Sequence, residues 1–443
     1  MAKRILIIGA GMSSTSLINR LLEQSEALDL YVQVNDTNLA LAQRKIHGHP
    51  RGEALSFDAL DKDIRRPYLQ NSDLVISMLP ARFHHLIIED CIELQKDVIT
   101  PSYLTAEVKA LEDKINQAGI LVLKEMGLDP GIDHMSAMKM VNDIRKEGGK
   151  MLRFESFTGG LIAPESDNNP WNYKFTWNPR NVVLAGQGGA ARYLQEGEYK
   201  YIPYHRLFSR IKPIEIDGYG EFEGYANRDS LSYRDVYNMK HIPTIYRGTL
   251  RKKGFCEAWN AFVQMGMTDD SYEMDNVQGM TWRTFLNSFL SYLPDETVEQ
   301  KIVNQLGISQ EVFDKIKWLG LFEDTPIGME KGTPAQILQK KLEEKWGLEK
   351  GDKDMIVMWH RLNYEKDGAE HEIHASMVVI GEDQDETAMA KTVGLPVAIA
   401  TELIIKGVIT RKGLVLPIEP DVYEPVLNEL EVCGIQFSEK QLF

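Results

Sequence analysis

Short apolar runs alternate with amphipathic stretches along the first 130 residues of the chain. The runs are typical of strands buried on both faces of a parallel sheet, and they are Ile5–Ile8, Leu30–Val34, Leu74–Met78, Asp97–Thr100 and Ile120–Leu123. Apolar residues recur at helical spacing between them and predict the helices Ser14–Gln24, Leu39–Ile46, Phe83–Leu94 and Ala106–Ala118. This strict alternation predicts an α/β fold, a doubly wound parallel sheet of Rossmann type.

The pattern changes beyond residue 150. Longer predicted strands, with many aromatic residues and glycines, indicate a mixed α/β region over Arg153–Leu250, and a mostly helical region follows over Cys256–Trp346. Two apolar runs, Asp354–Asn363 and Glu370–Ile380, flank an Asp-Gly turn and predict a β-hairpin. The next helix, Ala388–Ile405, is apolar on nearly every side, so we expect it to pack against an earlier domain.

Composition narrows the choice of partners. The 443 residues carry a net charge of −15, and an acidic chain gains nothing by approaching a phosphate backbone, so we expect no nucleic-acid partner. The three cysteines show no CxxC spacing and the ten histidines form no HxxxH or HExxH pattern, so we expect neither disulfides nor a metal site. No stretch reaches the roughly 18 uncharged apolar residues of a membrane span. We therefore expect a cytoplasmic protein without a membrane partner.

A glycine turn connects the first predicted strand to its helix. In the dinucleotide fingerprint the first glycine permits a tight turn and the second lets a pyrophosphate approach the backbone. The following helix start offers free N–H groups and a positive dipole end. Ser14 stands where glycine or alanine is usual, but it is small enough for close packing. The turn predicts dinucleotide binding by Gly9, Ala10, Gly11, Met12 and Ser13; the alternative is a plain β-turn-α connection.

An acidic residue follows the second predicted strand, where ribose recognition is expected. Asp36 lies 22 residues after Ser14, and a carboxylate there accepts hydrogen bonds from the ribose hydroxyls and repels a 2′-phosphate. We assign Asp36 and the adjacent Thr37 to the cofactor site and favour NAD over NADP. The alternative is a solvated turn aspartate.

Turn-forming and polar residues also follow the later predicted strands. Leu79-Pro80 and Ser102-Tyr103 stand at carboxyl ends of parallel strands, where ligands bind in open α/β sheets. The segment Gly127–His134, GLDPGIDH, places two carboxylates and a histidine within an irregular turn. The alternative for this segment is a helix start capped by Asp129 or Asp133.

Two further segments, Asn227–Ser230 and Tyr246–Arg251, contain arginines. The planar guanidinium suits bidentate binding of carboxylates. A substrate with several carboxylates would require such groups in one pocket, and the alternative is ordinary surface ion pairing.

These motifs, in this order, resemble the L-glutamate-forming saccharopine dehydrogenases, also called saccharopine reductases. The shared segments run through essentially all 443 residues and include GAGMSS, DLVISMLPARFHHLII, DVITPSYLT, KEMGLDPGIDHMSAMKM, TGGLIAPESDNNPWNYKFTW, YANRDS, YRGTLRKKGF, WLGLF and TVGLPVAIAT. The resemblance implies an oxidoreductase of lysine metabolism that acts on the CH–NH bond of saccharopine. Hydride leaves the ε-carbon for NAD(P)+, and hydrolysis of the imine gives L-glutamate and 2-aminoadipate 6-semialdehyde, or the reverse.

The resemblance also implies a domain plan and a homodimer. With boundaries from the residue pattern, 1–131 forms the Rossmann dinucleotide-binding domain and is completed by about 388–420. An α/β substrate and dimerisation domain takes 132–255 and 350–387, and a small all-helical domain takes 256–349.

Site residues follow from the same resemblance. Cofactor-facing positions beyond the glycine turn are Leu79, Pro80, Thr100, Asp129, Pro130 and Gly131. Substrate-binding positions are Ser102, Tyr103, Arg228, Arg247, Thr249, Leu250 and Arg251. Imine hydrolysis needs a base that activates water and an acid that protonates nitrogen. Asp129 is our first candidate for the proton acceptor or water-positioning group, and Tyr103 is the second.

The family comparison leaves two points open. Fungal members carry an arginine at the end of the second strand, suited to the 2′-phosphate of NADP, whereas this chain has Asn35-Asp36, which favours NAD. A carboxynorspermidine dehydrogenase-like enzyme is one alternative, but its more cationic substrate would need acidic walls rather than arginines. A non-catalytic NAD-binding sensor is the other, and it would not oxidise NADH in the presence of glutamate and the semialdehyde.

Overall fold

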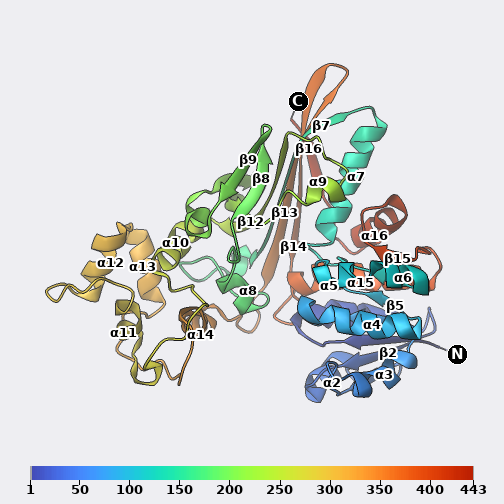
Figure 1. Ribbon diagram of the computed structural model, residues 1–443, viewed down its shortest axis with the longest axis horizontal. Coiled ribbons are helices and arrows are strands. Elements are labelled where there is room, and N and C mark those ends of the chain that lie inside the picture. Colours follow the sequence, from blue (N-terminus) through green and yellow to red (C-terminus); the bar gives the residue numbers. More distant parts are fainter. Residues whose placement is uncertain (1, 443) are drawn as a thin grey trace. The chain divides into compact units, whose positions relative to one another are not determined.

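The computed structural model of the protein describes residues 2–442 and divides into two compact units. Unit 1 contains the chain up to Met151, together with Tyr364–His371 and Met377–Lys440. Unit 2 contains Leu152–Asn363 and Glu372–Ser376, with the chain from Gln441 on. In Figure 1 the blue N-terminal strands and the red C-terminal elements therefore belong to the same unit.

Unit 1 is built on a seven-stranded sheet with the order β15-β6-β5-β4-β1-β2-β3. All its neighbouring strands are parallel. The strands are β1 (Lys3–Ile8), β2 (Leu30–Asn35), β3 (Gly52–Leu55), β4 (Leu74–Ser77), β5 (Asp97–Ile99), β6 (Leu121–Leu123) and β15 (Gly413–Val415). The strand order reverses between β1 and β4, which makes their carboxyl ends the switch point where such sheets bind ligands. The predicted doubly wound sheet is confirmed.

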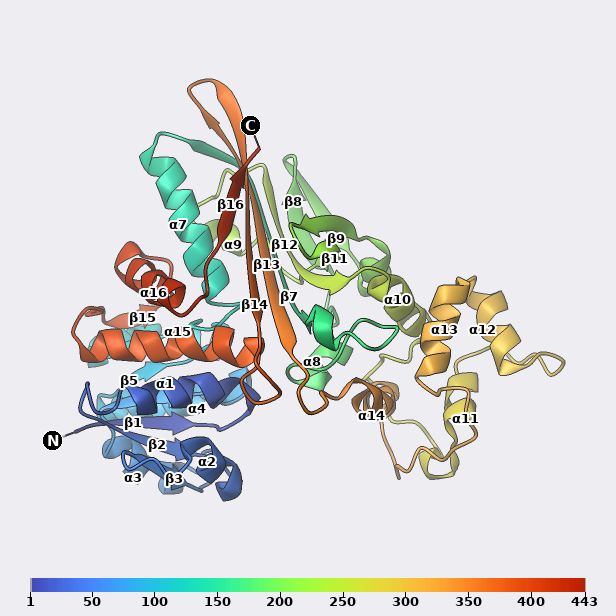
Figure 2. The same cartoon turned by 180° about the vertical axis from the view of Figure 1, so that it is seen from behind.

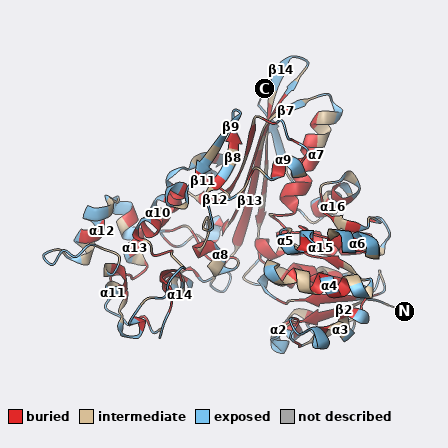
Figure 3. Cartoon of the chain, viewed as in Figure 1, coloured by how far each residue is buried: buried red, intermediate tan, exposed pale blue. Residues whose placement is uncertain are grey.

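Helices cover both faces of this sheet. The helices of unit 1 are α1 (Thr15–Glu23), α2 (Leu39–Ile46), α3 (Lys62–Gln70), α4 (His84–Leu94), α5 (Ala106–Lys109), α6 (Glu112–Ala118), α7 (Ile132–Lys146), α15 (Ala388–Ile405) and α16 (Pro420–Val432), of which α15 packs on α1 and α16 on α15 and α7. One hydrophobic cluster joins alternate strand residues such as Leu6 and Ile8 to apolar residues of α4 and α6 such as Ile87 and Ile115. Burial on both faces accounts for the unbroken apolar runs, and Figure 3 shows the strands as buried.

The sequence patterns do not predict β3 and α3. β3 has only four residues, none of them fully buried, so it leaves no apolar run. Four of the nine residues of α3 are charged and the helix contains Pro67, which hides its apolar stripe. The predicted helix Ala106–Ala118 is also interrupted, because Ala110 and Leu111 separate α5 from α6.

The apolar helix α15 packs directly on α1, and Figure 2 shows the two side by side. A Cβ at Gly394 would lie 2.8 Å from the backbone nitrogen of Leu17, so the contact requires glycine. Just before α15, Glu386 accepts a hydrogen bond of 2.8 Å from the Ser16 hydroxyl. By length and composition α15 could cross a membrane, but 72% of it is buried inside the protein, which is the pattern of a core helix.

The second sheet, most of which lies in unit 2, has nine strands in mixed directions. The order is β10-β11-β12-β7-β13-β14-β16, and off this path β8 pairs with both β12 and β9. The strands are β7 (Lys150–Ile162), β8 (Ala191–Gln195), β9 (Glu198–Ile202), β10 (Lys212–Ile216), β11 (Gly220–Ala226), β12 (Thr244–Lys252), β13 (Asp354–Lys366), β14 (Ala369–Ile380) and β16 (Ser438–Gln441). Positive φ angles of 53° at Asp367 and 79° at Gly368 form the turn between β13 and β14. The predicted hairpin is confirmed.

The remaining helices do not form a separate unit. They are α8 (Pro179–Val183), α9 (Tyr233–Val236), α10 (Phe255–Met265), α11 (Trp282–Asn287), α12 (Val298–Leu306), α13 (Gln310–Trp318) and α14 (Pro334–Trp346). Buried residues of α10 to α14 share one hydrophobic cluster with Trp171 and Tyr173. The expected independent helical domain is therefore not confirmed.

Candidate active site

The glycine turn after β1 has the backbone geometry that the dinucleotide motif requires. Gly9 has a φ of 108°, and a Cβ there would lie 3.1 Å from the carbonyl oxygen of Met78, so only glycine fits. Around Gly11, apart from its chain neighbours, no heavy atom lies within 4 Å of a Cβ position. This open space lies at the start of the 3-10 turn Met12–Ser14 that leads into α1. A pyrophosphate therefore fits against the Gly11 backbone and the exposed first N–H groups.

Asp36 follows β2 and supports this turn. Its Oδ2 accepts a hydrogen bond of 2.9 Å from the backbone N–H of Ala10, and its Oδ1 accepts one of 2.9 Å from that of Asn38. Each carboxylate oxygen keeps a further lone pair for a ribose hydroxyl. The neighbouring Asn35 is buried and bonded to the Phe57 backbone, so its role is structural, and Thr37 is exposed.

A lysine that the sequence patterns did not indicate lies beneath the turn. Lys45 of α2 donates hydrogen bonds of 2.6 Å to the carbonyl oxygen of Gly11 and 2.6 Å to the Thr15 hydroxyl. Burial lowers the pKa of Lys45 to about 8, against the opposing effect of Asp385 and Glu386. At neutral pH the turn therefore carries a cation close to the space beside Gly11.

Buried hydroxyl groups surround His84 at the carboxyl ends of β4 and β5. The Ser77 hydroxyl lies 2.9 Å from Nδ1, and the hydroxyls of Ser102 and Thr100 lie 2.9 Å and 3.0 Å from Nε2. Burial, and then the nearby Lys124, lower the pKa of His84 to about 2. The neutral imidazole therefore holds Ser102 and Thr100 at the strand ends. Leu79 and Pro80 follow β4 at the same edge, and Pro80 is exposed.

Tyr103 and Asp129 meet at this edge of the sheet. The Tyr103 hydroxyl donates a hydrogen bond of 2.7 Å to Asp129 Oδ1, and Tyr103 is 39% exposed, so the pair is accessible to a ligand. The loop that carries Asp129 closes on itself, because a Cβ at Gly131 would lie 2.0 Å from the Gly127 carbonyl oxygen. Pro130 within it is buried. A phenol and a carboxylate in contact can relay a proton.

Three buried ionisable residues lie behind this pair. Glu125 receives hydrogen bonds of 2.6 Å from the Leu104 N–H and 2.6 Å from His134 Nε2. Lys124 is fully buried, and within residues 2–442 its Nζ has no hydrogen-bond partner. Burial lowers the pKa of Lys124 to about 8, although Glu125 acts in the opposite direction.

In unit 2, the predicted arginines of β12 share one face of the strand. Residues 247, 249 and 251 alternate with residues that point to the other face, and the register sets Thr249 opposite Tyr225 of β11 and Thr158 of β7. Thr158 is buried, and its hydroxyl has no hydrogen-bond partner among the described residues. This face therefore combines buried cationic and hydroxyl groups.

Arg251 lies in an aromatic cage. Its guanidinium carbon is 5.2 Å, 5.7 Å and 5.4 Å from the ring centroids of Tyr173, Tyr225 and Phe255. The side chain is 4% exposed, Nε lacks a hydrogen-bond partner, and no carboxylate of the described chain pairs with it. A buried charge without a counter-ion is costly, so Arg251 is a strong candidate for binding a ligand carboxylate.

The other predicted substrate residues lie in different surroundings. Arg247 is buried and stacks on the Tyr233 ring at 3.7 Å, whereas Arg228 is exposed in the loop after β11. The Leu250 side chain points to the opposite face of β12, and its carbonyl oxygen accepts a hydrogen bond of 2.9 Å from Arg251 Nη1. Leu250 therefore contributes its backbone to the arginine face.

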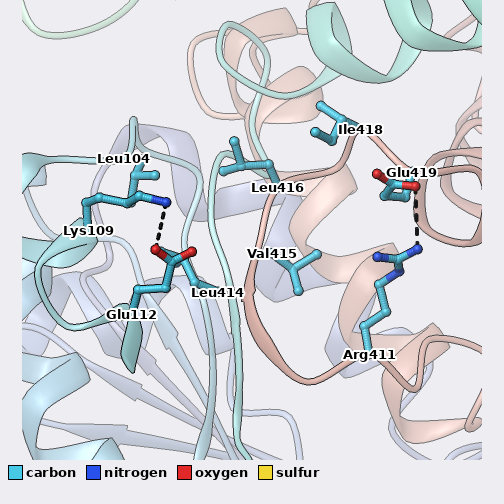
Figure 4. Close-up of a pocket in the computed structure, with 9 residues that line it drawn as sticks. All are labelled: Leu104, Lys109, Glu112, Arg411, Leu414, Val415, Leu416, Ile418 and Glu419. Carbon is cyan, nitrogen blue, oxygen red and sulfur yellow. Dashed lines mark ion pairs between the residues drawn. The ribbon is translucent and has the colours of Figure 1, made fainter. Parts of the chain in front are cut away.

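A separate cavity of about 250 Å³ opens in unit 1 beside Leu104. Figure 4 shows its apolar floor of Leu414, Val415 and Leu416 between two ion pairs, Lys109–Glu112 and Arg411–Glu419. Because its charged groups already pair with each other, the cavity offers a ligand no unsatisfied polar group. It contains none of the predicted site residues.

Sequence reasoning missed Lys45, His84, Lys124 and Glu125, and it named His134 only as part of the Gly127–His134 turn. Two signals were present. A Lys-Glu pair directly follows the apolar run Ile120–Leu123, where a buried strand end makes charge unusual, and two histidines open the apolar helix after Pro80. Lys45 gave no signal, because a lysine on an amphipathic helix is ordinary.

The parallel sheet, its switch point and the glycine turn define a dinucleotide-binding protein of the Rossmann class. Residues 5–123 match the family model "Saccharopine dehydrogenase NADP binding domain", and 127–435 match "Saccharopine dehydrogenase C-terminal domain". The chain belongs to the saccharopine dehydrogenase family.

Two fungal relatives are similar over nearly their whole length, and both are named saccharopine dehydrogenase [NADP(+), L-glutamate-forming]. The one from Saccharomyces cerevisiae is 34% identical over 99% of each chain, and the one from Schizosaccharomyces pombe is 31% identical over 98% of each. The solved structure of the apo Saccharomyces cerevisiae L-Glu-forming enzyme superposes with a TM-score of 0.90 at 33% identity and covers 100% of both chains. The cofactor is thus a nicotinamide dinucleotide, which the relatives' names give as NADP.

Proposed function

We propose that this protein is an L-glutamate-forming saccharopine dehydrogenase. It oxidises the secondary amine of saccharopine with NAD(P)+, or runs the reverse reaction, and the products are L-glutamate and 2-aminoadipate 6-semialdehyde. The observation that carries the proposal is Arg251, a buried guanidinium with no acidic partner in the described chain. A substrate with three carboxylates supplies that partner, and Thr249 and Arg247 lie on the same face of β12.

The dinucleotide is held by Gly9, Ala10, Gly11, Met12 and Ser13. Its nicotinamide supplies the hydride acceptor. The open space at Gly11 admits the pyrophosphate, and the Asp36 carboxylate accepts hydrogen bonds from the ribose hydroxyls. Leu79, Pro80, Thr100, Pro130 and Gly131 follow the strands at this edge and exclude water from the reacting atoms.

Asp129 and Tyr103 handle the proton steps. The Asp129 carboxylate accepts a proton from the amine or from the water that attacks the imine, and the Tyr103 hydroxyl, 2.7 Å away, relays it. Neutral His84 keeps Ser102 and Thr100 fixed beside them.

The test is the initial rate of saccharopine oxidation, compared with NAD and NADP at equal concentrations. A clear rate with either cofactor supports the reaction, and the preferred cofactor decides whether Asp36 excludes the 2′-phosphate. If neither cofactor gives a rate, the proposed reaction is wrong, and carboxynorspermidine and related polyamines become the substrates to assay. A protein that binds the dinucleotide but turns over none of these would be a sensor.

We further propose that the protein acts in the cytoplasm as a homodimer, without nucleic-acid or membrane partners. Three cysteines without disulfides, of which Cys91 and Cys256 are buried, fit a reducing compartment. Light scattering after size-exclusion chromatography tests the dimer, and a mass of one chain would exclude it.

A further inference from the structure

Glu125 has an unusual backbone for its place in the fold. It lies two residues beyond the end of β6 and has a φ of 61°. Of the non-glycine residues with positive φ in residues 2–442, Glu125 alone is buried. A left-handed conformation is unfavourable for such a residue and persists only when the surroundings hold it. The contacts of its side chain show what holds it.

The Glu125 carboxylate joins the two segments that carry Tyr103 and Asp129. Oε1 accepts a hydrogen bond of 2.6 Å from the N–H of Leu104, the residue after Tyr103. Oε2 lies 2.6 Å from Nε2 of His134, in the first turn of the helix that follows the Asp129 loop. Within residues 2–442, the hydrogen bonds of these two oxygens go to Leu104 and His134.

The charge state of Glu125 agrees with this role. Burial acts to raise the pKa of Glu125, but the hydrogen bonds from His134 and Leu104 outweigh it, so the pKa lies below the ordinary value. The carboxylate is therefore ionised at neutral pH, and both of its hydrogen bonds are charge-assisted.

The Tyr103–Asp129 hydrogen bond itself also joins the two segments, and Pro101 packs against Gly127, where a Cβ would lie 3.1 Å from the Pro101 carbonyl oxygen. The Met126 N–H donates a weaker hydrogen bond of 3.2 Å to the Thr100 carbonyl oxygen. The Asp129 loop is rigid in itself, since Gly131 N–H bonds to Asp133 Oδ1 at 2.6 Å. Tyr103, by contrast, is on an exposed loop. Fixing that loop against the Asp129 loop is what the Glu125 carboxylate adds.

We infer that Glu125 is a positioning residue, which together with His134 holds the Tyr103 hydroxyl against Asp129. The inference rests on the proposed function, in which these two groups handle the proton steps. A misplacement of about 1 Å in such a pair lowers the rate by roughly a hundredfold. Cofactor binding at the glycine turn does not involve Glu125 and is independent of it.

The experiment compares Glu125→Ala, Glu125→Gln and a matched control, Asp97→Ala. The Asp97 side chain also accepts a hydrogen bond from a backbone N–H, that of Leu121 at 2.7 Å, and so links β5 to β6. This link lies at the amino ends of the two strands, whereas Glu125 acts at their carboxyl ends. Glu125→Ala should lower kcat/KM for saccharopine roughly 10- to 100-fold and leave the Kd of NADPH within about twofold. Glu125→Gln should recover most of the rate, because an amide oxygen still accepts the Leu104 N–H and the amide N–H can donate to His134 Nε2 when the ring carries its proton on Nδ1. Asp97→Ala should retain the wild-type rate.

A second measurement separates this inference from the proposed function. The 19F resonance of 3-fluorotyrosine at position 103 reports the surroundings of the phenol without any turnover. It should move or broaden in Glu125→Ala and stay unchanged in Asp97→Ala. If the wild type has no activity but the resonance responds, only the proposed reaction fails. An unchanged rate and resonance in Glu125→Ala would overturn the inference, and if that variant does not fold, the same readouts on His134→Phe decide.

Discussion

The Asp36 carboxylate accepts a hydrogen bond of 2.9 Å from the backbone N–H of Ala10, and this bond holds the end of β2 against the glycine turn. In the dinucleotide motif a carboxylate at this position lies beside the ribose 2′-oxygen, so we expect the charge of Asp36 to disfavour NADP. Asp36→Asn keeps an oxygen acceptor for Ala10 but removes the charge. We expect the ratio of kcat/KM for NADPH to that for NADH to rise roughly tenfold, about 1.4 kcal/mol at close range in a partly solvated site. Initial rates with both cofactors measure it, and an unchanged ratio would show that Asp36 only supports the turn.

Asp129→Asn should separate chemistry from binding. The amide cannot accept the proton that the Asp129 carboxylate accepts, but it is the same size and can keep the contact with Tyr103. We expect kcat to fall roughly 100- to 10,000-fold, as for the loss of a general base, while the Kd of NADPH stays within about twofold. Stopped-flow rates and fluorescence titration give the two numbers. Unchanged turnover would remove Asp129 from the mechanism.

Arg251→Met should weaken saccharopine binding without destabilising the fold. The loss of a charge-assisted hydrogen bond to a substrate carboxylate corresponds to roughly 1.5–3 kcal/mol, or a fall of about 10- to 100-fold in kcat/KM. Because Arg251 has no acidic partner in the described chain, removing its charge should not lower the free energy of unfolding. Lys252→Met is the matched control, since Lys252 points to the other face of β12. Equal effects of the two variants would contradict the assignment.

Lys124 should make the stability of unit 1 depend on pH. Its pKa is lowered from 10.5 to about 8, so between these values the unfolded chain binds more protons and stability rises with pH. At pH 7 the buried ammonium lowers the free energy of unfolding by roughly 3 kcal/mol.

Lys124→Met should therefore be more stable than wild type at pH 7, and this difference should shrink towards zero near pH 10.5. Urea unfolding at both pH values measures it, and Lys114→Met, at an exposed position of α6, is the control. A constant difference across this range would mean that packing, not charge, separates the two proteins.

Gly394→Ala tests the contact between α15 and α1. The new methyl group would lie 2.8 Å from the Leu17 nitrogen and 3.2 Å from the Ser13 carbonyl oxygen, so the helices must move apart. Overpacking of this kind lowers stability by roughly 1–3 kcal/mol. Because Ser13 belongs to the dinucleotide turn, the affinity for NADPH should fall together with the stability. A stable variant with normal affinity would show that the contact adapts freely.

The sequence predicted five of the seven strands of the parallel sheet, because β1, β2, β4, β5 and β6 are largely buried on both faces and each leaves an apolar run. It did not predict the short edge strands β3 and β15, or α3, where four of nine residues are charged and a proline lies inside the helix. The glycine turn was also predictable, since Gly9 fills a position that no other residue can take.

The environments of the site residues were not predictable. The sequence marks Arg251 as an arginine among others, and only the rings of Tyr173, Tyr225 and Phe255, distant along the chain, show that its charge is buried. Glu125 and Lys124 are adjacent in sequence, but the Glu125 carboxylate takes part in two hydrogen bonds, whereas the Lys124 ammonium has none to any residue that the structure describes. Such differences arise from long-range packing, which local patterns do not record.

The cofactor-binding unit takes its last parallel strand, β15, and the helix that covers α1 from residues beyond 387. During translation, the glycine turn leaves the ribosome hundreds of residues before Gly394 and Glu386 can hold its helix in place. While unit 2 is still being synthesised, strands β1 to β6 of the nascent chain therefore lack β15 and the helix that packs on α1. Competence to bind the dinucleotide arises late in synthesis, when the C-terminal segment returns to the sheet.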